Sequence, residues 1–237
     1  SIKDFIHNRY ILYMSLFVIF SMMAATFVDY SFFNVTTLQM EANYLAQFLS
    51  AFEGLIVIFC ILIQVLATDR IQAMYGMRVS LLVSPVLIGL FTLAALGLGF
   101  AFGYDPEHQF FVVFFMAIAA SKLFIKSLKE GLDNPTFKLY LLPIESKIRI
   151  DVQTKIEGIV TAVASIIAGF AIVVITRVEV FDLLHITLFT LPLIALWYFV
   201  INKLHRSYRN TLQDTLKKNK EAATADAKQY TISQILE

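Results

Sequence analysis

The sequence of 237 residues is poor in charge, contains one cysteine and has no cluster of histidines. Charged residues make up 16% of it, whereas a soluble domain has about a quarter. The single cysteine excludes a disulfide within the chain, and the four histidines lack the spacing of metal ligands. The sequence has no nucleophile elbow, paired catalytic carboxylates or zinc-protease motif. We therefore expect no enzyme activity, no catalytic residues, no cofactor and no metal.

What the chain has instead is long hydrophobic runs. Hydrophobic residues make up 58% of it, and 22 residues are phenylalanine. A bilayer core about 30 Å thick is crossed by about 20 apolar residues of helix. The sequence predicts six transmembrane helices, at residues 10–28, 44–67, 79–102, 110–127, 156–176 and 181–202. Because the runs are continuous rather than alternating, we expect an all-α integral membrane protein with the lipid bilayer as a partner.

Basic residues lie almost entirely on one side of this predicted bundle. Eighteen of the 19 lie near the chain ends, between spans two and three, or from the last part of span four to the start of span five, and Arg177 is the exception. Cytoplasmic loops retain lysine and arginine, so a multi-pass protein with both termini in the cytoplasm is predicted. The net charge of +1 gives no support for a nucleic-acid partner.

The predicted domain organisation follows from the change of composition after the sixth span. Residues 1–205 are expected to form the transmembrane domain. Residues 206–237 are expected to form a cytoplasmic juxtamembrane helix, a polar linker and the start of a truncated soluble segment. Short matches between spans two and five, and between spans three and six, fit an inverted repeat of three plus three helices. Chance also produces matches of this length.

Five polar side chains are predicted to line or close a pathway through the bundle. Glu53 lies about nine residues inside the second span, on one helical stripe with Gln64. A carboxylate in hydrocarbon is costly, so Glu53 is expected either to handle solute or protons or to pack as a hydrogen-bonded residue. Lys122 is predicted to form an ion pair or to contact a phosphate. Lys126 is expected either to contribute to an anion site or to extend to the lipid head groups. Glu157 is expected to pair with Lys122 or Lys126.

Several stretches of the chain resemble one transporter family. They are Val28 to Phe33, Leu45 to Leu49, Tyr75 to Arg78, Lys129 to Pro143 and Lys155 to Gly158. Together these stretches resemble the ATP/ADP translocase (nucleotide transporter) family, in the bacterial branch where a twelve-helix major-facilitator-like unit is followed by HEAT-type repeats. The resemblance implies the C-terminal six-helix half of such a bundle, located in a bacterial inner membrane.

The same resemblance implies movement of an anionic solute, such as ATP or ADP, by alternating access. One departure concerns Phe33, which occupies a position where the family typically has a basic residue. Six helices are half of a carrier, so the resemblance also implies a second six-helix half, in the same longer chain or in another subunit. The alternative is a non-transporting anchor or scaffold subunit of a larger membrane complex.

Overall fold

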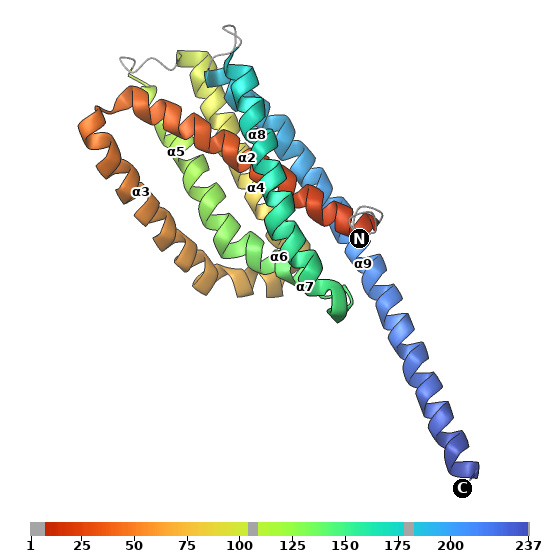
Figure 1. The fold of residues 1–237 in the computed structure, drawn as a ribbon. Coiled ribbons are helices and arrows are strands. Elements are labelled where there is room, and N and C mark those ends of the chain that lie inside the picture. Colours follow the sequence, from red (N-terminus) through yellow and green to blue (C-terminus); the bar gives the residue numbers. More distant parts are fainter. Residues whose placement is uncertain (1–7, 104–108, 178–182, 237) are drawn as a thin grey trace.

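The chain folds as a bundle of long helices. The structure is a computed structural model that describes residues 8–103, 109–177 and 183–236, and these residues contain no strand (Figure 1). The elements in chain order are α2 (Arg9–Gln39), α3 (Ala42–Leu62), η1 (Ile63–Thr68), α4 (Asp69–Phe102), α5 (Phe111–Leu128), η2 (Lys129–Asp133), α6 (Asn134–Tyr140), α7 (Ser146–Lys155), η3 (Ile156–Val160), α8 (Thr161–Thr176) and α9 (Leu183–Leu236). The three η elements are π-helical turns.

Five helical stretches in the described ranges are long and apolar enough to cross a membrane, where the sequence predicted six separate helices. The difference lies in the stretch Asn43–Phe102, whose 60 residues contain both the second and the third predicted span. Its helical path is interrupted at Gly76, which has φ 78° and ψ 167°. Only glycine adopts this conformation without strain. Figure 1 shows that α3 and the body of α4 run in opposite directions around this region.

The predicted end of the sixth span also differs from the structure. The sequence predicted a polar linker after a juxtamembrane helix, but α9 continues as one helix to Leu236. Residues 206–236 contain no glycine or proline, and they are rich in lysine, alanine and glutamine, which favour helix. Polar composition alone therefore did not break the helix. Figure 1 shows the C-terminal half of α9 projecting away from the bundle.

The main core joins α2 and α9 to the segment that follows α5. Trp197 of α9 is completely buried, and the ring of Phe17 in α2 lies 6.1 Å from it. Phe17 also stacks on Phe137 of α6, with ring centroids 5.3 Å apart. Aromatic side chains bury more apolar area than other residues, so this cluster accounts for much of the packing between these helices. In Figure 1, α2 lies across the bundle, in contact with α5, α8 and α9.

The outer surfaces of α3, η1 and α8 are apolar and exposed. Val65 of η1 is 71% exposed, and Ile166 and Phe170 of α8 are 71% and 69% exposed. Water-soluble monomers rarely leave contiguous apolar faces of this kind uncovered. The distribution of apolar side chains is therefore compatible with a multi-pass membrane protein.

The π-helical turns η1 and η2 pack directly against each other. The Thr68 hydroxyl donates to the Gly131 carbonyl over 2.6 Å and to the Ile63 carbonyl over 3.1 Å. A Cβ on Gly131 would lie 3.0 Å from both the Cys60 carbonyl oxygen and the Ile63 side chain. The missing side chain at Gly131 therefore sets how closely the two turns approach.

We expect Gly131→Ala to lower the unfolding temperature of the protein in detergent, because the added methyl group overpacks the contact between η1 and η2. Overpacking costs about 1–3 kcal/mol. The matched control is Gly158→Ala in η3, where no atom lies within 4 Å of the new Cβ. That control should keep or raise the unfolding temperature, since alanine favours helix over glycine. Equal unfolding temperatures for the two variants would contradict the packing argument.

Candidate functional site

Four charged side chains from three helices form one ion-pair cluster inside the bundle. Lys122 Nζ lies 2.5 Å from Asp29 Oδ1 and 3.7 Å from Glu53 Oε1. Lys126 Nζ lies 3.0 Å from the same Glu53 oxygen. Lys122 is completely buried, whereas the other three side chains are partly exposed. The cluster of Asp29, Glu53, Lys122 and Lys126 therefore connects α2, α3 and α5 through side chains of balanced charge.

Helical spacing explains why these residues meet. Lys122 and Lys126 are four residues apart on α5, so both project from one face. Glu53 of α3 approaches that face from one side and Asp29 of α2 from another. The Lys122 ammonium also lies over the rings of Phe32 and Phe33, 5.8 Å and 5.2 Å from their centroids. A buried ammonium needs such compensation, because removal from water is costly.

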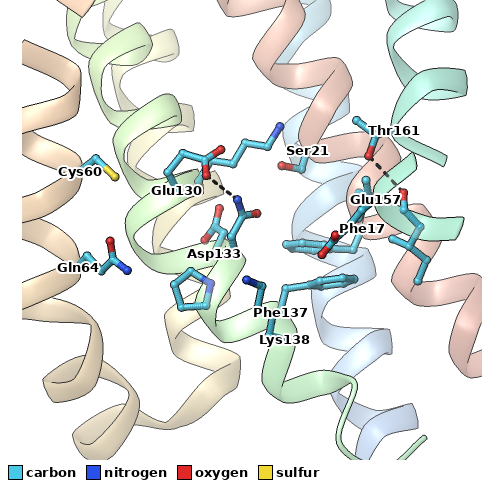
Figure 2. A pocket seen from close by; sticks show the side chains of 15 residues that line it. Phe17, Ser21, Cys60, Gln64, Glu130, Asp133, Phe137, Lys138, Glu157 and Thr161 are labelled. Atoms are coloured by element: carbon cyan, nitrogen blue, oxygen red, sulfur yellow. Dashed lines mark hydrogen bonds between the residues drawn. The ribbon is translucent and has the colours of Figure 1, made fainter. Parts of the chain in front are cut away.

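The second feature is a cavity of about 770 Å³ within the bundle (Figure 2). It lies among α2, the end of α3, the start of α8 and all three π-helical turns. Gln64 comes from η1, Glu130 and Asp133 from η2, and Glu157 from η3. Opposite them, α2 contributes Ser21. π-helical turns inside longer helices occur frequently at functional sites, and here each of the three turns borders the same cavity.

Asp133 is the most unusual side chain of this cavity. It is 2% exposed, and its Oδ1 accepts a hydrogen bond from the Ser84 hydroxyl over 2.7 Å. Its Oδ2 is buried and has no hydrogen-bond partner among the described residues. Glu130, by contrast, accepts a hydrogen bond from the Asn134 amide over 2.9 Å. A buried carboxylate oxygen without a donor is costly, so this atom is where a bound group would gain most.

The basic residues that line the cavity differ from those of the ion-pair cluster. Lys129 Nζ lies 3.1 Å from the Met22 sulfur, and no carboxylate oxygen of the described residues lies within 4.0 Å of it. Lys138, on α6, is exposed and also lines the cavity. The cavity therefore presents ammonium groups that are available to a bound molecule, whereas Lys122 and Lys126 are already paired.

The five residues predicted from the sequence divide between the two features. Glu53, Lys122 and Lys126 belong to the ion-pair cluster, and Gln64 and Glu157 line the cavity. The expected pair between Glu157 and a lysine of α5 is not formed. Glu157 instead accepts a hydrogen bond from Gln153, one turn earlier along its own helical stretch, over 2.8 Å. Asp29 and Glu53 already neutralise the two lysines, so neither lysine requires an ion pair with Glu157.

Sequence reasoning missed Asp29 and Asp133, and it expected Lys129 to reach the lipid head groups, whereas Lys129 lines the cavity. Asp29 was placed at the end of the first span, but α2 continues to Gln39, so Asp29 lies well inside the helix. Lys129 was expected on the fourth helix, on one face with Lys122 and Lys126, and Asp133 in the cytoplasmic segment after it. In the structure η2 and α6 continue the helical path of α5 to Tyr140. A signal for Asp29 was present in its apolar surroundings. No comparable feature of the sequence indicates a π-helical turn at Lys129–Asp133.

Comparisons of the chain with models of protein families, with curated proteins and with solved structures found no match. The arguments that follow therefore rest on the contacts, burial and charges described above.

Replacing Lys122 by methionine should destabilise the protein strongly, because it leaves the Asp29 carboxylate without its partner. Breaking a buried pair on one side costs about 3–5 kcal/mol. Adding Asp29→Asn should recover part of that loss by removing the unpaired charge. Unfolding temperatures in detergent measure both effects. The control Lys126→Met removes the more exposed of the two lysines and should cost less. Equal losses at the two lysines would contradict the ranking by burial.

Proposed function

We propose that this chain is a six-pass membrane protein and one half of a major-facilitator-like carrier, moving a small charged solute by alternating access. The cavity is the solute site, and the ion-pair cluster is the contact that changes during transport. The size of the cavity, about 770 Å³, is the observation that carries the proposal, because small-molecule sites enclose about 300–1,000 Å³. A charged side chain buried among apolar helices is costly, and binding of a solute would explain the presence of the buried Asp133 in this cavity.

Six passes follow when the stretch Asn43–Phe102 is counted as two. Its 60 residues at 1.5 Å each exceed a bilayer core of about 30 Å, and the interruption at Gly76 separates α3 from most of α4. The distribution of basic residues then favours cytoplasmic termini. A bacterial inner membrane is the location we propose, by the resemblance to nucleotide carriers.

The ion-pair cluster suits a closing contact because it depends on side chains rather than on close helix packing. Glu53 connects α3 to α5, and both lysines lie within 4 Å of its carboxylate. The outer side of α3 is exposed, whereas Phe52 on its inner side stacks with Phe32 of α2. Movement of α3 would therefore rearrange this aromatic contact together with the ion pairs. Alternating access requires an element with two discrete arrangements. We assign that role to α3, held in one arrangement by Glu53.

The charge of the solute needs a revised argument. The expectation of an anionic solute such as ATP or ADP came from the resemblance, with Lys122 as a candidate phosphate contact. In the structure Lys122 and Lys126 are both compensated by carboxylates. An anion would have to displace Glu53 from Lys126, or bind at Lys129 and Lys138 in the cavity. The proposal therefore specifies a charged solute without requiring a net negative charge.

A second candidate function is a membrane anchor or scaffold within a larger complex. The exposed apolar faces of α3 and α8 favour it, because they would cover a neighbouring helical subunit as readily as they would face lipid. The same faces would also receive the second six-helix half that a carrier needs. The two functions differ in whether the cavity opens to both sides of the membrane.

The single native cysteine provides the test, because Cys60 lines the cavity. In sealed vesicles that hold the purified particle, a membrane-impermeant maleimide should label Cys60 from both sides if access alternates. Glu53→Gln weakens the contacts between α3 and α5, so it should raise labelling from the less accessible side several-fold. Mass spectrometry of the labelled chain measures the extent.

Two controls complete this experiment. Cys60→Ser gives the background, and Asp151→Asn removes an ion pair that lies within one helix, between Asp151 and Lys155. The second control should label like the unmodified protein. Labelling from one side only, in both the unmodified protein and Glu53→Gln, would reject alternating access and favour the scaffold.

A further inference from the structure

The unpartnered oxygen of Asp133 restricts what the cavity can bind. Asp133 lies on η2, is 2% exposed and lines the cavity, and Figure 2 shows its carboxylate among the side chains that surround the open space. One oxygen accepts a hydrogen bond from Ser84, whereas Oδ2 accepts none from any residue that the structure describes. When Asp133 is ionised this oxygen is an acceptor only, so a group that completes it must donate a hydrogen.

The polar neighbours of Asp133 make their hydrogen bonds elsewhere. Asn134, the next residue, donates to Glu130. Lys129, four residues earlier, lies against the Met22 sulfur, and within the described ranges it has no carboxylate oxygen inside 4.0 Å. Thr136 donates to the Leu132 carbonyl. Within the described part of the chain, no side chain therefore completes the second oxygen of Asp133.

The carboxylate of Asp133 favours a cation at this position. The lining contains three carboxylates, on Glu130, Asp133 and Glu157, and two ammonium groups, on Lys129 and Lys138. Glu130, Glu157 and Lys138 are all exposed, so solvent weakens their effects on a bound molecule more than that of the buried Asp133. A protonated amine both donates a hydrogen bond and neutralises charge, and such charge-assisted hydrogen bonds are about twice as strong as neutral ones.

The apolar part of the lining limits the rest of the molecule. Phe17 and Phe137 both border the cavity and stack with an interplanar angle of 11°. They are buried to the same extent as the core, with 4% and 6% exposure, so they form a fixed aromatic wall. Aromatic walls bind apolar bodies and the faces of other rings. Asp133 and this wall border one cavity, which suits a molecule with a cationic end and an apolar end.

We propose that the cavity binds small protonated organic amines, with the ammonium group donating to Asp133 Oδ2 and the hydrocarbon body against Phe17 and Phe137. This inference adds the chemical class of the solute to the proposed function. It rests on the proposed function in one respect, that the cavity is the solute site. Binding needs no covalent or redox step.

The test compares three probes that share one apolar body and differ in one group: phenethylamine, phenethyl alcohol and phenylpropionate. Calorimetric titration of the full chain in nanodiscs, with empty nanodiscs as the blank, should give binding of the amine that is at least about tenfold tighter than that of the alcohol or carboxylate. Equal binding of amine and alcohol would overturn the proposal, because a neutral donor would then suffice. Tighter binding of the carboxylate would show an anion site instead.

Substitutions at and near Asp133 test whether this residue causes the preference for the amine. Asp133→Asn keeps the shape and an oxygen for Ser84 but removes the charge, so it should lose the preference for the amine. The matched control Asp151→Asn, on the exposed face of α7, should bind like the unmodified protein. Unchanged amine binding by Asp133→Asn would overturn the proposal. If that variant does not fold, Lys129→Met removes a repelling ammonium from the same cavity and should tighten amine binding, and unchanged or weaker binding would overturn it.

This result is separable from the test of transport. Amine binding that depends on Asp133, together with Cys60 labelling from one side only, would support the amine site and reject the carrier. Labelling from both sides without amine binding would support the carrier and reject this assignment of its solute.

Discussion

The arrangement of the bundle depends on how one fully buried ammonium group, that of Lys122, is neutralised. A lysine at that depth in an apolar helix is tolerated only beside an opposite charge, so α5 must lie where Asp29 of α2 reaches it. Glu53 then attaches α3 to the same pair of lysines. Apolar packing has little direction in such a bundle, whereas this cluster specifies which faces of three helices meet. Further polar side chains line the separate cavity.

The cavity, in turn, depends on departures from regular α-helix. Each π-helical turn adds a residue to one turn and shifts the side chains that follow it, and η1, η2 and η3 do so at the same level of the bundle. The close contact at Gly131 holds η1 to η2, and Asp133 follows in the same turn. A regular helix through residues 129–133 would direct these side chains differently. The irregular backbone and the unpartnered carboxylate thus belong to one local structure.

The sequence predicted the helical class and the approximate position of each apolar run, because run length and continuity carry that information directly. The span at 156–176 coincides with η3 and α8, and the span at 110–127 lies one residue from α5. The contacts between polar side chains of different helices were less predictable. Glu53 and Lys126 were identified as polar residues in spans, but their contact depends on the rotation of α3 against α5. Asp133 could not be identified, since its importance comes from what surrounds it and not from its own spacing.

The continuous helix α9 has a mechanical consequence. Its 54 residues measure about 80 Å, and its first part is fixed in the core through Trp197, Ile201 and Leu204. No glycine, proline or loop interrupts the helix after Pro192, so a tilt of its buried part also tilts its projecting part. A tilt of a few degrees within the bundle displaces the end near Leu236 by several ångströms. Small rearrangements among α2, α4 and α9 therefore become large movements outside the bundle, at the place where Figure 1 shows the helix standing alone.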